Sequence, residues 1–120
     1  MADYIPKFPA GAVVTLTTSA DVTGGHVVEL SAAGTVAHAA ADSAKVVGVA
    51  ARDSKSGEQV AVFVGKGTVH RLVASAAIAA GAKVITATGG KVATIGAGTN
   101  PVGLALTAAT NADDVIEVLV

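Results

Sequence analysis

Short runs of alternating apolar and polar residues recur along nearly the whole chain, and glycine or a polar cluster ends each run. Such alternation is typical of β-strands, because successive side chains point to opposite faces of a sheet. The gaps between the runs are too short for crossover helices of a dozen residues. The pattern therefore predicts ten short strands, at residues 13–18, 26–30, 35–39, 45–51, 59–64, 68–73, 83–88, 91–95, 102–106 and 114–120. We expect an all-β fold, a small barrel or sandwich of short antiparallel strands.

Glycines mark two of the predicted turns. The pair Gly89-Gly90 separates two alternating runs and can adopt the positive φ angles that a two-residue hairpin turn requires. Ala33-Gly34 separates an earlier pair of runs in the same way. Both sites predict tight hairpins.

The two halves of the chain place glycines and valines in nearly the same order. This register predicts pseudo-repeated halves, at about residues 20–65 and 76–120, within a single β domain of residues 11–120. Two copies are too few for a solenoid. Gly25, Gly34 and Val36 match Gly81, Gly90 and Val92 at an offset of 56, and Gly48, Ala50 and Val60 match Gly103, Ala105 and Val115 at an offset of 55.

The composition adds an expectation about assembly. Hydrophobic residues make up 52% of the chain and charged residues only 14%, so a monomer has few polar groups with which to cover its surface. Extended apolar surface marks interfaces with other chains. We therefore expect an oligomer or a component of a larger assembly.

Catalytic, metal-binding and cofactor-binding motifs are absent from the sequence. The chain has no cysteine, and its histidines, His26, His38 and His70, lie on separate predicted strands without ligand spacing. No nucleophile elbow or phosphate-binding loop occurs. We expect no catalytic residue, no metal, no cofactor and no enzymatic activity.

Nucleic acid and membranes are equally poor candidates as partners. The net charge is −1 and no cluster of Lys and Arg occurs, so contacts to phosphates are not favoured. The apolar run at residues 72–82 is too short to span a bilayer, and the first residues lack the pattern of a secretory leader.

Residues 1–10, MADYIPKFPA, predict an extended N-terminal arm. Pro6 and Pro9 remove backbone donors and favour an extended chain, and Tyr4, Ile5 and Phe8 supply apolar side chains. Fully extended, such a segment reaches about 33 Å, enough to cross a neighbouring subunit. The alternative is that Tyr4 and Phe8 fold back and close the end of their own barrel.

The order of several segments resembles that of a known family. The segments are IPKFPAG, VTLTTSADVTGGHVVEL, VVGVAARDSKSGEQVAVFV, HRLVAS, IAAGAKV, VGLAL and DVIEVLV, which together run from Ile5 to Val120. In this order they resemble the capsid decoration, or head cement, proteins of tailed bacteriophages and, more distantly, the head decoration protein of phage lambda.

The resemblance implies a homotrimer on the outer surface of the virion capsid, made in the host cytoplasm. Its partner would be the major capsid protein, whose neighbouring subunits it would clamp together. The capsid-contacting arm would map onto Tyr4, Ile5, Pro6, Lys7 and Phe8. Two other functions remain open: a tail or fibre module that contacts host carbohydrate, and a small β-barrel enzyme.

Overall fold

The computed structural model describes Tyr4, Lys7, Gly11 and residues 13–120. It confirms the all-β prediction, and each of the ten predicted strands is present with ends that shift by at most two residues. The strands are β1 (Val13–Thr18), β2 (Val27–Ala32), β3 (Thr35–His38), β4 (Val46–Ala50), β5 (Gln59–Phe63), β6 (Val69–Val73), β7 (Lys83–Ala87), β8 (Lys91–Thr94), β9 (Gly103–Ala105) and β10 (Val115–Leu119).

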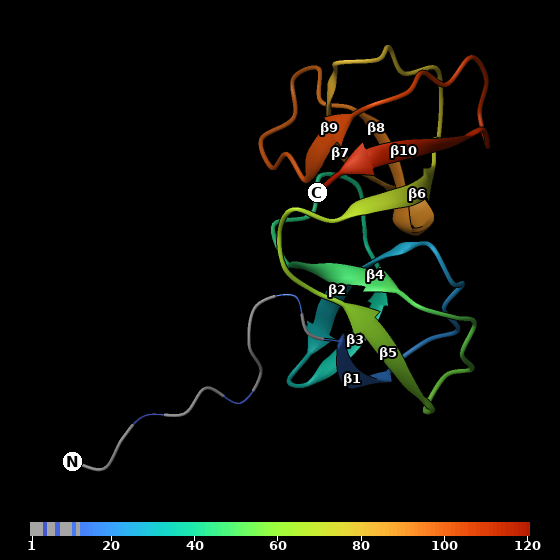
Figure 1. Cartoon of the computed structure of the whole chain (residues 1–120). Helices are drawn as coiled ribbons and strands as arrows, with labels where there is room; N and C mark the ends of the chain where they lie inside the picture. The colour runs from blue at the N-terminus through green and yellow to red at the C-terminus, as the bar shows by residue number, and fades with distance from the viewer. Residues whose placement is uncertain (1–3, 5–6, 8–10, 12) are drawn as a thin grey trace.

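The first five strands close into a barrel in the order β1-β3-β2-β4-β5. Strand β5 pairs antiparallel with both β4 and β1, and β2 lies antiparallel between β3 and β4. The closing contact is parallel, with Thr17 opposite Thr35 and Thr18 opposite Val36. Figure 1 shows this barrel beside the sheet that the later strands form.

The last five strands repeat this pairing. They form a sheet in the order β6-β10-β9-β7-β8, so β6 to β10 take the places of β1 to β5. The parallel closing contact recurs as one bridge between Ala74 and Val92. The loop bridge between Val22 and Ser54 likewise has a counterpart between Ile78 and Ala109. The two halves therefore share one topology, which begins at β1 and β6, before the predicted starts at about residues 20 and 76.

The structure corrects one matched pair. Thr17 pairs with Gln59 in the first half, and Val73 pairs with Val115 in the second half. The counterpart of Val60 is therefore Ile116 and not Val115. Burial agrees, because Val60 and Ile116 are both buried, whereas Val115 is 61% exposed. The loop before β10 is one residue longer than the loop before β5, so the offset returns to 56.

The two predicted glycine turns differ from each other in length. Residues Thr88–Gly90 form a three-residue 3₁₀ turn, so the predicted two-residue turn at Gly89-Gly90 is wrong in length. Both glycines do adopt positive φ, 78° at Gly89 and 75° at Gly90. In the earlier hairpin Ala32 pairs with Thr35 across Ala33-Gly34, which is the two-residue turn that the sequence predicts.

The hydrophobic core continues from one half into the other. One cluster joins Val27, Ala39 and Val49 of the barrel to buried residues of the second sheet such as Leu72 and Val84. A separate cluster fills the barrel itself, with Val28, Val36, Val60 and Val62 at its centre. Burial of this shared apolar surface holds the two halves together.

Polar contacts fix the same junction. Thr86 is 1% exposed, and its Oγ1 donates to Ala40 O at 2.7 Å and accepts from Ser43 N at 2.9 Å. The Asp42 carboxylate accepts from the backbone N–H groups of Thr99 and Asn100. The segment after β3 is thereby tied to β7 and to the loop before β9.

Candidate interaction surfaces

Apolar side chains gather on the outward face of the second sheet. Val69, Leu119 and Leu104 lie in one row across β6, β10 and β9, because Leu119 pairs with both of the others. Their exposed fractions are 49%, 39% and 37%. Such a row of exposed aliphatic side chains is typical of a surface that contacts another protein.

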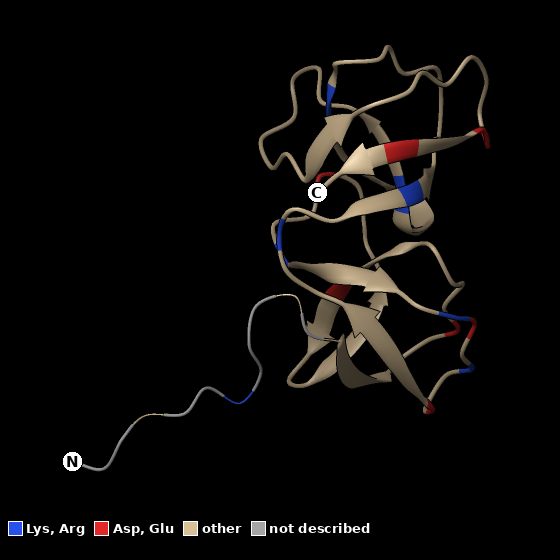
Figure 2. Ribbon diagram, viewed as in Figure 1, with Lys and Arg blue, Asp and Glu red and all other residues tan. Residues whose placement is uncertain are grey.

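Two more exposed residues extend this face. Leu106 donates its N–H to Glu117 O, and Val115 follows the same alternation along β10. We call the set Val69, Leu104, Leu106, Val115 and Leu119 the outer sheet face. The charged residues on this side of the sheet include Glu117 and Arg71, which pair across β10 and β6, and Lys83, which pairs with Leu104. Figure 2 shows how few Lys, Arg, Asp and Glu residues lie on the described strands, compared with the loops.

An apolar groove borders the outer sheet face. It has a volume of about 470 Å³, and its lining includes Lys66, Lys83, Pro101, Val102, Leu104 and Val120. Lys83 lies opposite Leu104 across β7 and β9. We refer to this site as the β7–β9 groove.

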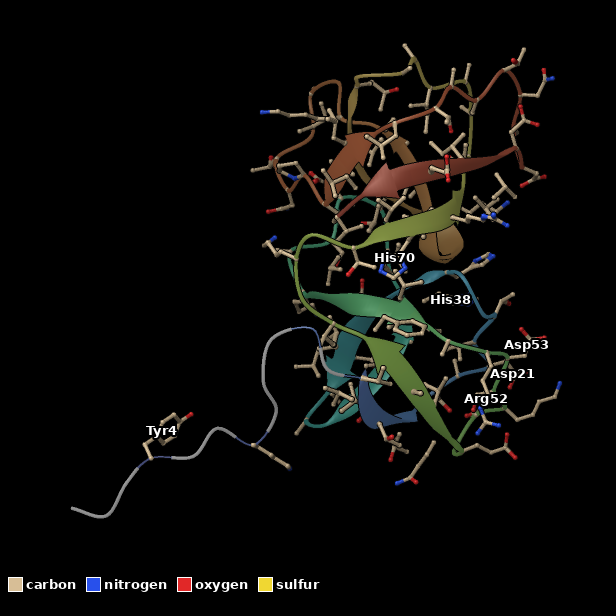
Figure 3. The ribbon with its side chains drawn as sticks, viewed as in Figure 1. Tyr4, Asp21, His38, Arg52, Asp53 and His70 are labelled. Carbon is tan, nitrogen blue, oxygen red and sulfur yellow. The ribbon has the colours of Figure 1, made fainter. Side chains whose placement is uncertain are left out.

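A second cleft of about 500 Å³ lies at the junction of the halves. Phe63 and His70 face each other there, with ring centroids 5.9 Å apart, and Val47 and Asn100 also line it. Figure 3 shows His70 between the two halves. Burial lowers the pKa of His70, which favours the neutral imidazole. The cleft is therefore lined mainly by apolar and uncharged side chains, together with Lys66.

The predicted arm residues fall at the edge of the described structure. Tyr4 is 79% exposed, Lys7 is exposed as well, and Figure 3 places Tyr4 away from both halves. Ile5, Pro6 and Phe8 lie outside the described residues. The choice between a capsid-contacting arm and a plug for the chain's own barrel stays a prediction.

His26 and His38 stack with ring centroids 5.0 Å apart, a pairing that the sequence did not predict. Thr23 N donates to His38 Nε2 at 2.8 Å, and His26 Nδ1 lies 2.8 Å from Gly89 O. Burial, and secondarily the neighbouring His26, lowers the pKa of His38. The pair arises because β2 and β3 are adjacent strands. The sequence does not show which strands pair, so it could not predict this contact.

Carboxylates cluster at the loops that follow β1 and β4, where they accept hydrogen bonds from backbone N–H groups. Asp21 accepts from Ser56 N at 2.8 Å and lies 3.6 Å from Lys55 Nζ. The hydrogen bond from Ser56, reinforced by Lys55, lowers the pKa of Asp21. Asp53 accepts from Gly24 N at 2.9 Å.

Within the described part of the chain, no group of three or more His, Asp or Glu side chains could hold a metal ion. In the same residues no helix has the length and apolar character needed to cross a membrane. Among the described residues, the candidate functional features are therefore apolar surfaces and not a cluster of polar side chains.

The fold is similar to that of a solved phage protein structure. It is described as the crystal structure of head fiber gp8.5 N base in bacteriophage phi29, and it aligns with a TM-score of 0.69 at 15% sequence identity. The alignment covers 91% of this chain and 92% of that one, so the likeness extends to both halves.

No curated protein sequence gave a significant match to the chain. The sequence does match a protein family, described as phage cement protein, over residues 8–120. This match includes all ten strands and both halves. The chain therefore belongs to the phage cement protein family.

Proposed function

We propose that this protein is a capsid decoration protein that binds the outside of an assembled phage head as a homotrimer and stabilises contacts between major capsid subunits. The observation that carries the proposal is the family match over residues 8–120. A cement protein is a structural component of the virion and does not belong to an enzyme family. We also propose that the protein is made in the host cytoplasm and then binds the outer capsid surface.

The surfaces of the molecule support this role. The outer sheet face and the β7–β9 groove offer exposed aliphatic area with few charges among the described residues. Binding of such surfaces to other chains removes apolar area from water, at roughly 25 cal/mol per Å². A trimer with capsid contacts uses this area for association.

Stabilisation of a shell follows from where such a protein binds. A site composed of several capsid subunits exists only in the assembled shell, so bound decoration protein shifts the equilibrium toward assembly. A trimer adds multivalency, since three linked copies dissociate together only when all of their contacts break. Individually weak contacts can then resist opening of the head.

The arm is the proposed capsid contact. Tyr4, Ile5, Pro6, Lys7 and Phe8 precede β1 and combine apolar side chains with one cation. An extended segment of this kind can add to an exposed edge of another protein through its backbone hydrogen-bonding groups. The role therefore depends on residues that lie before the barrel and leaves the barrel itself unchanged.

Binding to undecorated heads tests the function. Purified protein is titrated onto heads that lack it, the heads are sedimented, and the bound copies are counted. We expect saturation at an integer number of trimers per symmetry-related site, with a higher temperature of head disruption. Absence of binding to heads would reject the proposal.

Deletion of residues 2–9 tests the arm. The expected result is a large loss of head affinity with an unchanged unfolding midpoint, because the deleted residues precede the sheet. The substitution Ala112→Ser is a control, since it changes an exposed loop residue outside both the arm and the outer sheet face and should leave head affinity unchanged. Full head affinity of the deletion variant would contradict the arm assignment.

A further inference from the structure

Inside one chain, the turn between β7 and β8 is seated on the first barrel. Gly90 N donates to Ala39 O at 3.1 Å, and Gly89 O lies 2.8 Å from His26 Nδ1. The approach is close enough that a side chain on Gly90 would have its Cβ only 2.5 Å from Val27 O. The second half thus presents a glycine turn to the first half.

The second half covers the barrel at β2 and β4, and the turn itself meets β2 beside Val27. Val27 and Val49 pair across these strands, and the second half covers both of them, to exposed fractions of 2% and 4%. Ala39 lies in the same buried cluster. Without the second half these residues would form an exposed apolar surface.

The equivalent surface of the second half is uncovered. Because β7 and β9 take the places of β2 and β4, Lys83 and Leu104 correspond to Val27 and Val49, and they pair in the same way. Leu104 is 37% exposed and lines the β7–β9 groove. Lys83 and Leu104 of the groove are therefore the uncovered counterparts of Val27 and Val49, which the second half covers within the chain.

The equivalent turn of the first half is exposed, and its printed side-chain contact is the local hydrogen bond from Thr35 Oγ1 to Ala33 O. Ala33 and Gly34 correspond to Gly89 and Gly90, and Gly34 has the same positive φ, 69° against 75°. A Cβ on Gly34 would meet no atom within 4 Å, and Ala32 and Ala33 are exposed. In Figure 1 the β2–β3 hairpin and β9 belong to opposite ends of the molecule, so one chain cannot join them.

We propose that the β2–β3 turn of one copy binds in the β7–β9 groove of the next copy, reproducing between chains the contact that joins the two halves within a chain. The inference rests on the proposed oligomer and names its interface. Both surfaces lie on every copy and face in different directions, so the contact is head to tail. Such a contact closes into a ring when the rotation allows it, and a trimer is one such ring.

Lys83 of the groove differs in charge from its counterpart. Lys83 stands where the first half has Val27. The aliphatic part of a lysine side chain can cover apolar surface while its ammonium group stays hydrated or bonded. In the proposed contact the ammonium of Lys83 donates to the carbonyl of Ala33, which corresponds to the Gly89 carbonyl beside His26.

Charged substitutions on the two surfaces test the interface by solution mass. Leu104→Asp and Ala33→Asp each introduce a carboxylate at an exposed position, so the fold should persist, which circular dichroism and the unfolding midpoint check. We expect each variant to fall from the oligomer mass to the monomer mass of 11.5 kDa. Ala112→Asp, in an exposed loop outside the groove and the outer sheet face, should keep the oligomer. Folded Leu104→Asp and Ala33→Asp variants with unchanged oligomer mass would overturn the proposal.

Crosslinking gives a second readout that does not need dissociation. The natural chain has no cysteine, so Ala33→Cys and Leu104→Cys can be placed singly on differently tagged chains and mixed. A short bismaleimide should join the two chains to each other, whereas mixing Ala33→Cys with Ala112→Cys should give no product. Equal crosslinking of both mixtures, or of neither, would overturn the interface.

Head binding separates this inference from the proposed function. Heads that bind the wild-type protein, together with an absent mixed crosslink, reject the interface and leave the decoration role standing. A Leu104→Asp variant that keeps its oligomer but loses head binding assigns the groove to the capsid, which also rejects the interface. A mixed crosslink in a protein that never binds heads keeps the interface and rejects the decoration role.

Discussion

Gly48 and Gly103 occupy equivalent positions at which two strands of one half come unusually close. A methyl group on Gly48 would collide with the carbonyl oxygen of Phe63, and one on Gly103 would collide with that of Leu119. In both cases the obstacle is backbone, which cannot rotate aside. These glycines are therefore needed for the close approach of strands, and they are the central glycines of the sequences VVGVA and VGLA.

Gly48→Ala and Gly103→Ala should each destabilise the fold by about 3 kcal/mol, at the upper end of the cost of overpacking. Gly57→Ala is the matched control, because its φ of 87° is strained for alanine but its Cβ would meet nothing within 4 Å. The control should lose only about 1 kcal/mol. Urea unfolding measures all three variants, and equal losses at Gly48 and Gly57 would contradict the steric explanation.

Histidine titration predicts how stability depends on pH. The pKa values of His38 and His70 are lowered in the folded protein, mainly by burial. Below about pH 6.5, the ordinary value, the unfolded chain takes up protons that these folded side chains resist, so stability should fall with decreasing pH. Above that pH these histidines are neutral in both the folded and the unfolded chain, so their titration no longer lowers stability.

The measurement is the urea midpoint at several values between about pH 7.5 and pH 5.5. A variant with both His38→Gln and His70→Gln should show a shallower dependence than the wild-type protein. A wild-type midpoint that stays constant across this range, or rises as the pH falls, would contradict the assignment.

At the scale of elements, strand positions follow from local sequence and strand partners do not. The alternation in VVTLTT and QVAVFV predicts where β1 and β5 lie, because residues two apart in a strand point to the same face of the sheet. The parallel contact of β1 with β3, and hence closure of the barrel, depends on residues far apart in sequence.

This dependence on residues far apart in sequence explains one wrong match and one missed contact. Matching Val60 to Val115 relied on residue identity, and the extra residue before β10 was not visible in a chain so rich in valine. The stacked pair of His26 and His38 also required the pairing of β2 with β3. Of the predicted arm, Tyr4 and Lys7 are described, and its contact with the capsid stays a prediction.

One buried hydroxyl group, that of Thr86, links the two halves at their junction. Thr86→Val keeps the shape of the side chain but leaves Ser43 N and Ala40 O without the partner that Thr86 supplies. An unsatisfied buried group costs about 1–3 kcal/mol, so we expect a loss of that size. Thr86→Ser retains the hydroxyl and should lose less, by denaturant unfolding. An equal loss for both substitutions would show that the hydroxyl is not the stabilising group.

For the whole molecule, the shared core predicts how the chain unfolds. Val27, Ala39 and Val49 are buried only with the second sheet in place, so neither half keeps its burial alone. We therefore expect residues 11–120 to unfold as a single domain in one cooperative transition, observed by calorimetry and by far-UV circular dichroism. Two separated transitions would contradict the single-domain assignment.

The central claim is that the protein decorates the outside of the phage head, and cryo-electron microscopy of heads with and without it tests that claim most directly. The difference map should contain density for trimers on the outer capsid surface, at positions where capsomers meet. Each feature should fit three copies of the two-halved fold. A difference map without density on the outer surface, or with density only at the tail, would contradict the account.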